Sequence, residues 1–165
     1  MVDYNAPTKE MNFVLYDVID IKEITALERF QDASDDIIEA VLEEAGKFCR
    51  DVLSPLNVIG DRDGARLTEE GVKPAPGFKE AYSAYAENGW TSISGNPDFG
   101  GQGLPLTLAS AVYEFVDAAN MAFSLNPMLT TGAIESIVAH GSEEQKAQYL
   151  EKMISGEWAG SMNLT

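Results

Sequence analysis

The feature that most constrains the fold is an amphipathic pattern between residues 34 and 53. Apolar side chains recur there every three or four residues over four turns, at Ile37, Ile38, Val41, Leu42, Ala45, Phe48, Cys49, Val52 and Leu53. This 3.6-residue period predicts a long helix with one buried face. Ser34 supplies an N-cap, and Asp35 and Asp36 complement the helix dipole in the first turn. We expect the helix to end at Ser54-Pro55.

Shorter stretches with the same period predict further helices. They cover residues 13–21 capped by Asn12, residues 78–86 closed by Asn88-Gly89, the stripe Leu108–Ala119 opened by Pro105, and residues 133–140 after a break at Asn126-Pro127. A capping box at Ser142 and Gln145 predicts a last helix, which ends at Gly156. Residues 57–76 are rich in Gly, Asp and Pro, so we expect a loop there with a turn at residues 69–71.

Trp158 to Leu164 is the first stretch of the chain that resembles a strand. A single strand cannot pair with itself and is unstable in isolation. Either another chain pairs with it or the rest of its sheet lies outside this sequence. The pattern therefore predicts an all-α fold of five or six helices with one strand at its end.

Composition excludes several classes of function. The 165 residues are 45% apolar, which suffices for one domain with a sizeable core. The net charge of −16 argues against a helical regulator that binds nucleic acid and against binding to anionic membranes. No apolar run approaches the roughly 18 residues of a membrane span, and residues 1–10 do not resemble a signal peptide. With a single cysteine and no intramolecular disulfide, we expect a soluble cytoplasmic protein.

Side chains suited to catalysis are few. The chain has one histidine and one cysteine, which argues against a His-rich metal site or a Cys–His dyad. We interpret Cys49 as a core residue on the buried helix face and His140 as a residue that interacts with free carbonyls at a helix end. Glu135 interrupts an apolar helix and is interpreted as facing outward. Paired-carboxylate hydrolysis stays open, but no particular pair of acids is indicated.

The segment Phe99-Gly100-Gly101-Gln102-Gly103 has three glycines in four residues. It lacks the Gly-Lys-Ser/Thr end of a phosphate-binding P-loop, and no strand precedes it as the dinucleotide-binding fingerprint requires. We therefore interpret it as a tight turn that lets one helix pack close to the next.

Several segments, in order along the chain, resemble the acyl-CoA dehydrogenase family. Residues 97–103 are similar to the family's Pro-x-x-Tyr-Gly-Gly-x-Gly loop, and residues 140–158 to its Gly-Ser/Thr-Glu-Glu-Gln-Lys…Tyr-Leu…Gly-Glu segment. Residues 162–165, Met-Asn-Leu-Thr, resemble a family strand that continues into Glu-Pro. Residues 13–20 and 53–57 look like a bacterial branch with an extra N-terminal helical segment, which includes methylmercaptopropionyl-CoA dehydrogenase-like enzymes.

The resemblance implies a domain organisation and an activity. Residues 1–33 would form an extension with a short helix, residues 34–156 the family's helical N-terminal domain, and residues 157–165 the first strand of a middle β-domain. We therefore expect a fragment of an FAD-dependent enzyme. That enzyme removes the α-proton of an acyl-CoA thioester and passes the β-hydride to the flavin, giving an enoyl-CoA. An electron-transferring flavoprotein would accept the electrons, and a homo-oligomer is expected.

Cofactor contacts are also implied by the resemblance. They fall on Met162, Leu164 and Thr165, at strand positions that hold the polar edge of the flavin ring. The family's catalytic base is a glutamate of the C-terminal bundle, so no catalytic residue and no metal ligand is assigned in this chain. We expect the fragment alone to be inactive. The alternative is a stand-alone helical interaction module without redox activity.

Substrate contacts are implied at three positions of one helical region. They fall on Ser124, Met128 and Gly132, which would line the acyl pocket. A small residue at Gly132 would leave room for a longer or bulkier acyl chain.

Overall fold

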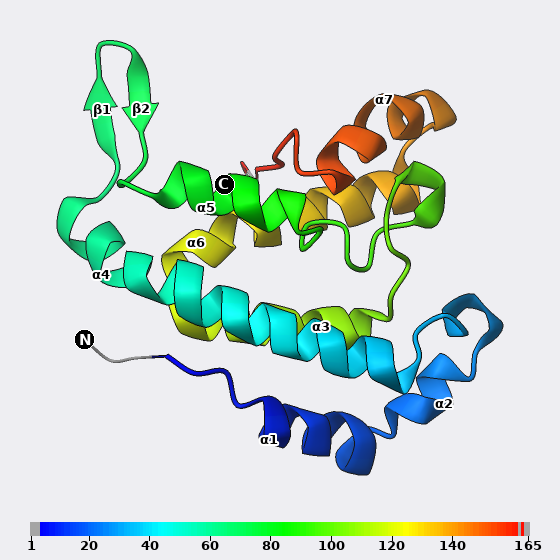
Figure 1. Cartoon of the computed structure of the whole chain (residues 1–165). Coiled ribbons are helices and arrows are strands. Elements are labelled where there is room, and N and C mark those ends of the chain that lie inside the picture. Colours follow the sequence, from blue (N-terminus) through cyan, green and yellow to red (C-terminus); the bar gives the residue numbers. More distant parts are fainter. Residues whose placement is uncertain (1–3, 162, 164–165) are drawn as a thin grey trace.

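The computed structural model describes residues 4–161 and Asn163. In chain order the elements are α1 (Thr8–Phe13), η1 (Val14–Val18), α2 (Ile21–Thr25), η2 (Glu28–Phe30), α3 (Asp35–Phe48), η3 (Cys49–Leu53), α4 (Ser54–Asp63), β1 (Arg66–Thr68), β2 (Gly71–Lys73), α5 (Phe78–Glu87), η4 (Pro97–Phe99), α6 (Leu106–His140) and α7 (Glu143–Ile154). The described part is mostly helical, as predicted. Figure 1 shows α1 alongside a long rod formed by α3 and α4, with α6 behind this rod.

The amphipathic stretch forms a longer helical rod than we predicted. Ser34 caps it as expected, because its Oγ accepts a hydrogen bond from the backbone N–H of Ile37 at 3.4 Å. The rod does not end at Ser54-Pro55. Instead α3 passes through η3, a π-helical turn, directly into α4. A proline ring clashes with the carbonyl four residues earlier in a regular α-helix, and the wider π turn before Pro55 relieves that clash.

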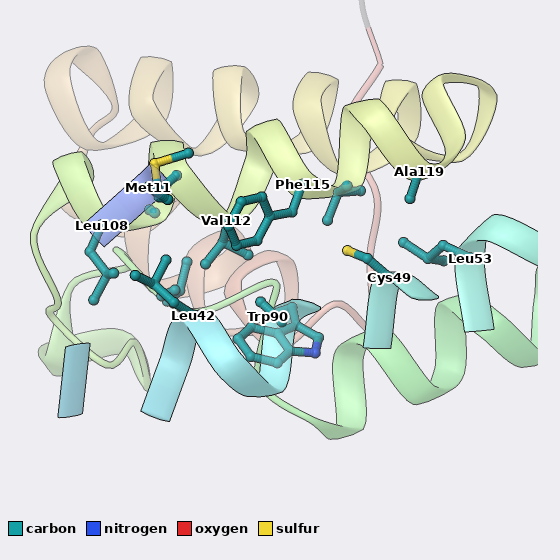
Figure 2. Packing of buried hydrophobic residues seen from close by; sticks show 14 of the residues in the cluster. Met11, Leu42, Cys49, Leu53, Trp90, Leu108, Val112, Phe115 and Ala119 are labelled. Carbon is teal, nitrogen blue, oxygen red and sulfur yellow. The ribbon is translucent and has the colours of Figure 1, made fainter. Parts of the chain in front are cut away.

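Helix α6 departs from the prediction in the position of its break. Its helical conformation continues through Asn126-Pro127, and the non-helical residue is Asn120, with φ −159° and ψ 86°. The buried Asn120 side chain stabilises this bend at both ends of its amide. Its Nδ2 donates to the Leu53 carbonyl at 3.2 Å, and its Oδ1 accepts from the Phe123 backbone N–H at 3.1 Å. Figures 1 and 2 show the second half of α6 turning back along the first.

The N-terminal helix begins earlier than predicted. It starts after Pro7 and continues through the π-helical turn η1, so Asn12 lies inside the helix and caps nothing. Met11 and Leu15 are buried in the core against α3. A left-handed residue, Asp20 with φ 53°, then separates η1 from α2.

Residues 57–76 are only partly the loop that we predicted. The first seven of them complete α4, and β1 and β2 then form a two-stranded antiparallel hairpin. The predicted turn is present, because Glu69 and Glu70 connect the two strands. Leu67 pairs with Val72 across the hairpin, and both side chains are exposed.

We expected the glycine-rich loop to let two helices pack closely. Instead it lets residues 101–104 pack against residues 93–95 of the preceding segment. The Gly103 N–H donates to the Gly95 carbonyl at 2.9 Å, and the Leu104 N–H donates to the Ile93 carbonyl at 3.0 Å. A Cβ on Gly101 would lie 2.0 Å from the Gly95 backbone. Only glycine therefore permits this approach.

The main core lies between the α3–η3 rod, α5 and the first half of α6. Figure 2 shows the α6 face of this core, with its labelled residues Leu108, Val112, Phe115 and Ala119. Cys49 is fully buried there, as predicted. A second, smaller cluster joins the end of α6 to α7 through Ile134, Leu150, Met153 and Ile154.

In the C-terminal region the predicted capping box of α7 is confirmed, and the predicted strand at residues 158–164 is not decided. Ser142 Oγ accepts from the Gln145 N–H at 3.2 Å, and Gln145 Oε1 accepts from the Ser142 N–H at 2.9 Å. Neither residues 157–161 nor Asn163 form a strand, since no second strand pairs with this described segment. Met162, Leu164 and Thr165 lie outside the described residues, so the domain boundary at residue 157 stays a prediction.

Candidate functional site

A cavity of about 220 Å³ lies between α5 and the two halves of α6. Its lining residues are Tyr85, Tyr113, Val116, Asp117, Ser124, Pro127, Met128 and Thr131. In a straight helix, Tyr113 and Thr131 would be separated by about 27 Å along the axis, at 1.5 Å per residue. That separation is too long for one small cavity. The bend at Asn120 therefore creates the site by turning one stretch of α6 toward the other.

Two of the three predicted acyl-pocket residues meet at this cavity. Ser124 and Met128 lie one helical turn apart on its wall. Gly132 lies one further turn along α6, exposed, and no atom lies within 4 Å of the position that its Cβ would take. Gly132 is not among the lining residues, and its role in substrate binding stays a prediction.

Sequence reasoning missed most of the other lining residues. Tyr85 and Val116 were assigned to core stripes, and Pro127 was interpreted as a helix end. Tyr113 and Asp117 carry a weak signal, because two polar side chains four residues apart lie on one helix face. That signal acquires meaning only once the bend at Asn120 places this face opposite Ser124 and Met128.

The hydroxyl groups of the cavity wall differ in whether they have partners. Ser124 Oγ donates to the Met121 carbonyl at 2.9 Å, and Thr131 Oγ1 donates to the Pro127 carbonyl at 3.0 Å. The buried Tyr85 hydroxyl has no hydrogen-bond partner among the described residues. Its ring is fixed by an edge-on contact with Phe123, at 5.5 Å between centroids.

The protonation state of Tyr85 follows from its surroundings. Burial raises the pKa of its hydroxyl above the ordinary value, and the nearby Tyr113 and Asp117 add to this rise. Tyr85 is therefore a neutral hydroxyl at physiological pH and presents an O–H donor. Glu135 is exposed, as predicted, and His140 is the exposed last residue of α6.

The cavity at the bend of α6 is too small to enclose a flavin. Pockets for drug-sized ligands measure about 300–1,000 Å³, and flavin adenine dinucleotide is larger than such ligands, whereas this cavity measures about 220 Å³. The predicted flavin contacts Met162, Leu164 and Thr165 lie outside the described residues. Among residues 4–161 and Asn163, no cluster of three His, Cys, Asp or Glu residues is arranged to hold a metal ion. Within the same described ranges, no helix is both long and apolar enough to cross a membrane.

Comparison with known proteins gives concordant matches. Residues 35–157 match the family model described as "Acyl-CoA dehydrogenase, N-terminal domain". The 3-methylmercaptopropionyl-CoA dehydrogenase of Ruegeria pomeroyi is 41% identical over 162 residues, which cover 98% of this chain and 28% of that protein. A butyryl-CoA dehydrogenase of Syntrophomonas wolfei is 31% identical over 168 residues, which cover 99% of this chain and 27% of that protein. The chain thus spans about a quarter of the length of these relatives.

A solved structure supports the fold. It is described as "Electron transferring flavoprotein of Acidaminococcus fermentans: Towards a mechanism of flavin-based electron bifurcation". The match has a TM-score of 0.60 at 18% identity and covers 74% of this chain and 30% of the other. At this identity the likeness concerns the fold alone. The family model and the identity to the Ruegeria protein together show that the chain belongs to the acyl-CoA dehydrogenase family, whose N-terminal domain it carries.

Proposed function

We propose that this domain forms one wall of the acyl-chain pocket in an FAD-dependent acyl-CoA dehydrogenase, which converts acyl-CoA thioesters to enoyl-CoA. The observation that carries the proposal is the cavity at the bend of α6, where Ser124 and Met128 lie together. Its aromatic and aliphatic walls suit an acyl chain. Membership of the family supports the reaction class.

The proposed reaction divides its chemistry between this domain and the rest of the enzyme. Desaturation of an acyl-CoA needs a carboxylate base, a hydride acceptor and a pocket that excludes water. Flavin adenine dinucleotide would supply the hydride acceptor when bound. Residues of α5 and α6 would hold and orient the acyl chain. The base is proposed to lie beyond residue 165, as the resemblance implies.

We propose further that residues 1–165 alone do not catalyse this reaction. The small cavity and the absence of the family's base from this sequence support that view. The purified chain is expected to show no flavin absorption band and no reduction of a dye acceptor by acyl-CoA. Either observation would contradict the proposal.

The complete enzyme is proposed to be a homo-oligomer that passes electrons to an electron-transferring flavoprotein. Met121, Leu125 and Met128 form an exposed apolar stripe on the second half of α6. Such a stripe is typical of a surface that other domains or copies cover.

The test is a substitution that fills the cavity in the complete flavin-loaded protein. Ser124→Leu adds bulk at the wall, so kcat/KM should fall at least tenfold more for long acyl-CoAs than for short ones. The assay is acyl-CoA-dependent dye reduction over a series of chain lengths. Ser136→Leu is a matched control, because Ser136 lies on the same helix, is exposed, and donates to the Gly132 carbonyl at 2.9 Å.

Three outcomes decide the proposal. A chain-length profile that changes in Ser124→Leu and not in Ser136→Leu supports it. A folded, flavin-loaded protein that oxidises no acyl-CoA at all would refute the reaction. Retained oxidation with identical profiles in both variants would remove the cavity from the substrate site. Gly132→Phe in the same series tests whether that position also limits chain length.

A further inference from the structure

The acyl cavity has one charged side chain among the described residues that line it, Asp117. Asp117 is half-buried on the first half of α6, and it takes part in none of the ion pairs that the described residues form. A carboxylate in a largely apolar wall acts strongly on a nearby charge, because little water screens it there. Its charge is therefore available to a bound acyl group.

No base in the surrounding sequence neutralises this charge. Residues 80–145 contain neither lysine nor arginine, and this range includes every lining residue of the cavity and all of α6. Lys79 and Lys146, which border the range, do not line the cavity. The wall thus carries a negative charge without an internal counter-ion.

The hydroxyls on the second half of α6 offer an anionic ligand no free donor. Ser124 Oγ donates to the Met121 carbonyl at 2.9 Å, and Thr131 Oγ1 donates to the Pro127 carbonyl at 3.0 Å. A second carboxylate brought into this cavity would lose its hydration and would be repelled by the charge already present. The cavity is therefore unsuited to acyl groups that end in an anion.

Tyr113 adds an aromatic face to the same wall. It lies four residues before Asp117, so the two side chains share one face of α6, and both line the cavity. Tyr113 is half-buried, which leaves part of its side chain free for contact. A ring beside a carboxylate suits an organic cation, because the ring attracts it through its quadrupole and the carboxylate through its charge.

We propose that Asp117 sets the charge selectivity of the acyl cavity. It excludes acyl groups that end in a carboxylate, and it favours acyl groups that end in a cation over uncharged groups of the same shape. This inference rests on the proposed function and specifies the substrates of that site by their charge. Tyr113 would contact the cationic end together with Asp117.

The experiment compares acyl-CoAs of matched shape in the complete flavin-loaded enzyme, over several chain lengths. One pair ends in a trimethylammonium or a tert-butyl group, which differ in charge and hardly in shape. A second pair ends in a carboxylate or a methyl group. The measured quantities are the ratios of kcat/KM for the charged member to kcat/KM for the uncharged member. Asp117→Asn should lower the first ratio and raise the second, each about tenfold, which corresponds to about 1.4 kcal/mol.

Glu114→Gln is the matched control for this experiment. Glu114 is an exposed carboxylate on the same helix and does not line the cavity, so both ratios should stay within about twofold of wild type. Asp117→Ser, which is also uncharged, should repeat the changes seen in Asp117→Asn.

Two results would overturn the inference while the enzyme still oxidises acyl-CoA. One is a pair of ratios that stays unchanged in Asp117→Asn. The other is a wild-type enzyme that uses the tert-butyl substrate better than the trimethylammonium substrate. Failure to oxidise any acyl-CoA would instead refute the proposed function, and the inference with it.

Equilibrium binding gives a second readout that needs no turnover. The enoyl-CoA products of the trimethylammonium and tert-butyl substrates are already desaturated, so titration calorimetry can measure the Kd of each without reaction. Asp117→Asn should weaken binding of the cationic product about tenfold relative to its neutral partner, and Glu114→Gln should not. An unchanged Kd ratio in Asp117→Asn would show that the Asp117 charge does not act on the bound acyl group, and would overturn the inference.

Discussion

The two halves of α6 have similar apolar sequences and different roles. Before the bend, the helix buries a nearly continuous face in the main core, through Leu108, Ala109, Ala111, Val112, Phe115, Val116 and Ala119. After the bend, Met121, Leu125, Met128 and Val138 are exposed, and the helix forms a wall of the cavity. Apolar content therefore does not distinguish a core helix from a substrate-binding one. What a helix faces decides its role, and here Asn120 decides what the second half faces.

The largest difference between the halves should appear on truncation of a large side chain. Phe115 is 1% exposed, so Phe115→Ala should lower the free energy of unfolding by about 3–5 kcal/mol through lost burial and a cavity. Met128 is 54% exposed, and Met128→Ala should change the free energy of unfolding by less than about 0.5 kcal/mol. Chemical denaturation of both variants measures the difference. Equal losses would show that the apolar face around Met128 is packed as tightly as the face around Phe115.

The bend itself should be the next most sensitive point. Asn120→Ala leaves the Leu53 carbonyl and the Phe123 N–H without their partner, so we expect a loss of about 2–4 kcal/mol. Asn126→Ala is the control, because Asn126 is exposed on the same helix. Its stability should stay close to that of the parent chain. A loss below about 0.5 kcal/mol in Asn120→Ala would show that packing alone fixes the bend.

The starts of α3 and α7 were predictable because their capping signals are local, whereas the start of α1 was not. Ser34 and Ser142 bond to N–H groups three residues away, and both caps were predicted correctly. The bend was misplaced because Asn120 is stabilised by Leu53, which is 67 residues distant in sequence. At the prolines, by contrast, a local signal was given too much weight. Pro55 and Pro127 were interpreted as helix ends, yet both lie within continuous helical segments.

The residues of the candidate site also divide into those that the sequence indicates and those that only the fold brings together. Ser124 and Met128 followed from a resemblance of sequence, which carries positions without requiring their geometry. Tyr85, Tyr113 and Asp117 enter the site only because α6 turns back toward α5. The helical period around Tyr85 indicates an ordinary core residue, and no local pattern marks it as part of a site. Its unpaired hydroxyl is visible only in the folded structure.

The smallest effect should come from a change of pH acting on the first half of α6. Cys49 is fully buried in the core that this half forms (Figure 2), and burial raises the pKa of its thiol from 9.0 to about 12. The unfolded thiol therefore loses its proton at a lower pH than the folded one. The resulting stability is fully present below pH 9 and is lost as the pH rises toward 12. Between pH 8 and pH 10 this group should lower the free energy of unfolding by about 1.4 kcal/mol.

Cys49→Ala isolates this contribution. Buried tyrosines also destabilise the fold at high pH, but most of their effect cancels in the difference, because burial, and not Cys49, is the largest cause of the raised pKa of Tyr85. The gap in unfolding free energy between wild type and Cys49→Ala should narrow by about 1.4 kcal/mol from pH 8 to pH 10, and a constant gap would contradict the assignment. A cysteine introduced at Met128 in the Cys49→Ala background should react with a thiol reagent much faster than Cys49 does in the wild type. Because Cys49 lies against the first half of α6 and position 128 lies on the second half, unequal reactivity would show that the apolar face around Met128 is not packed as Cys49 is.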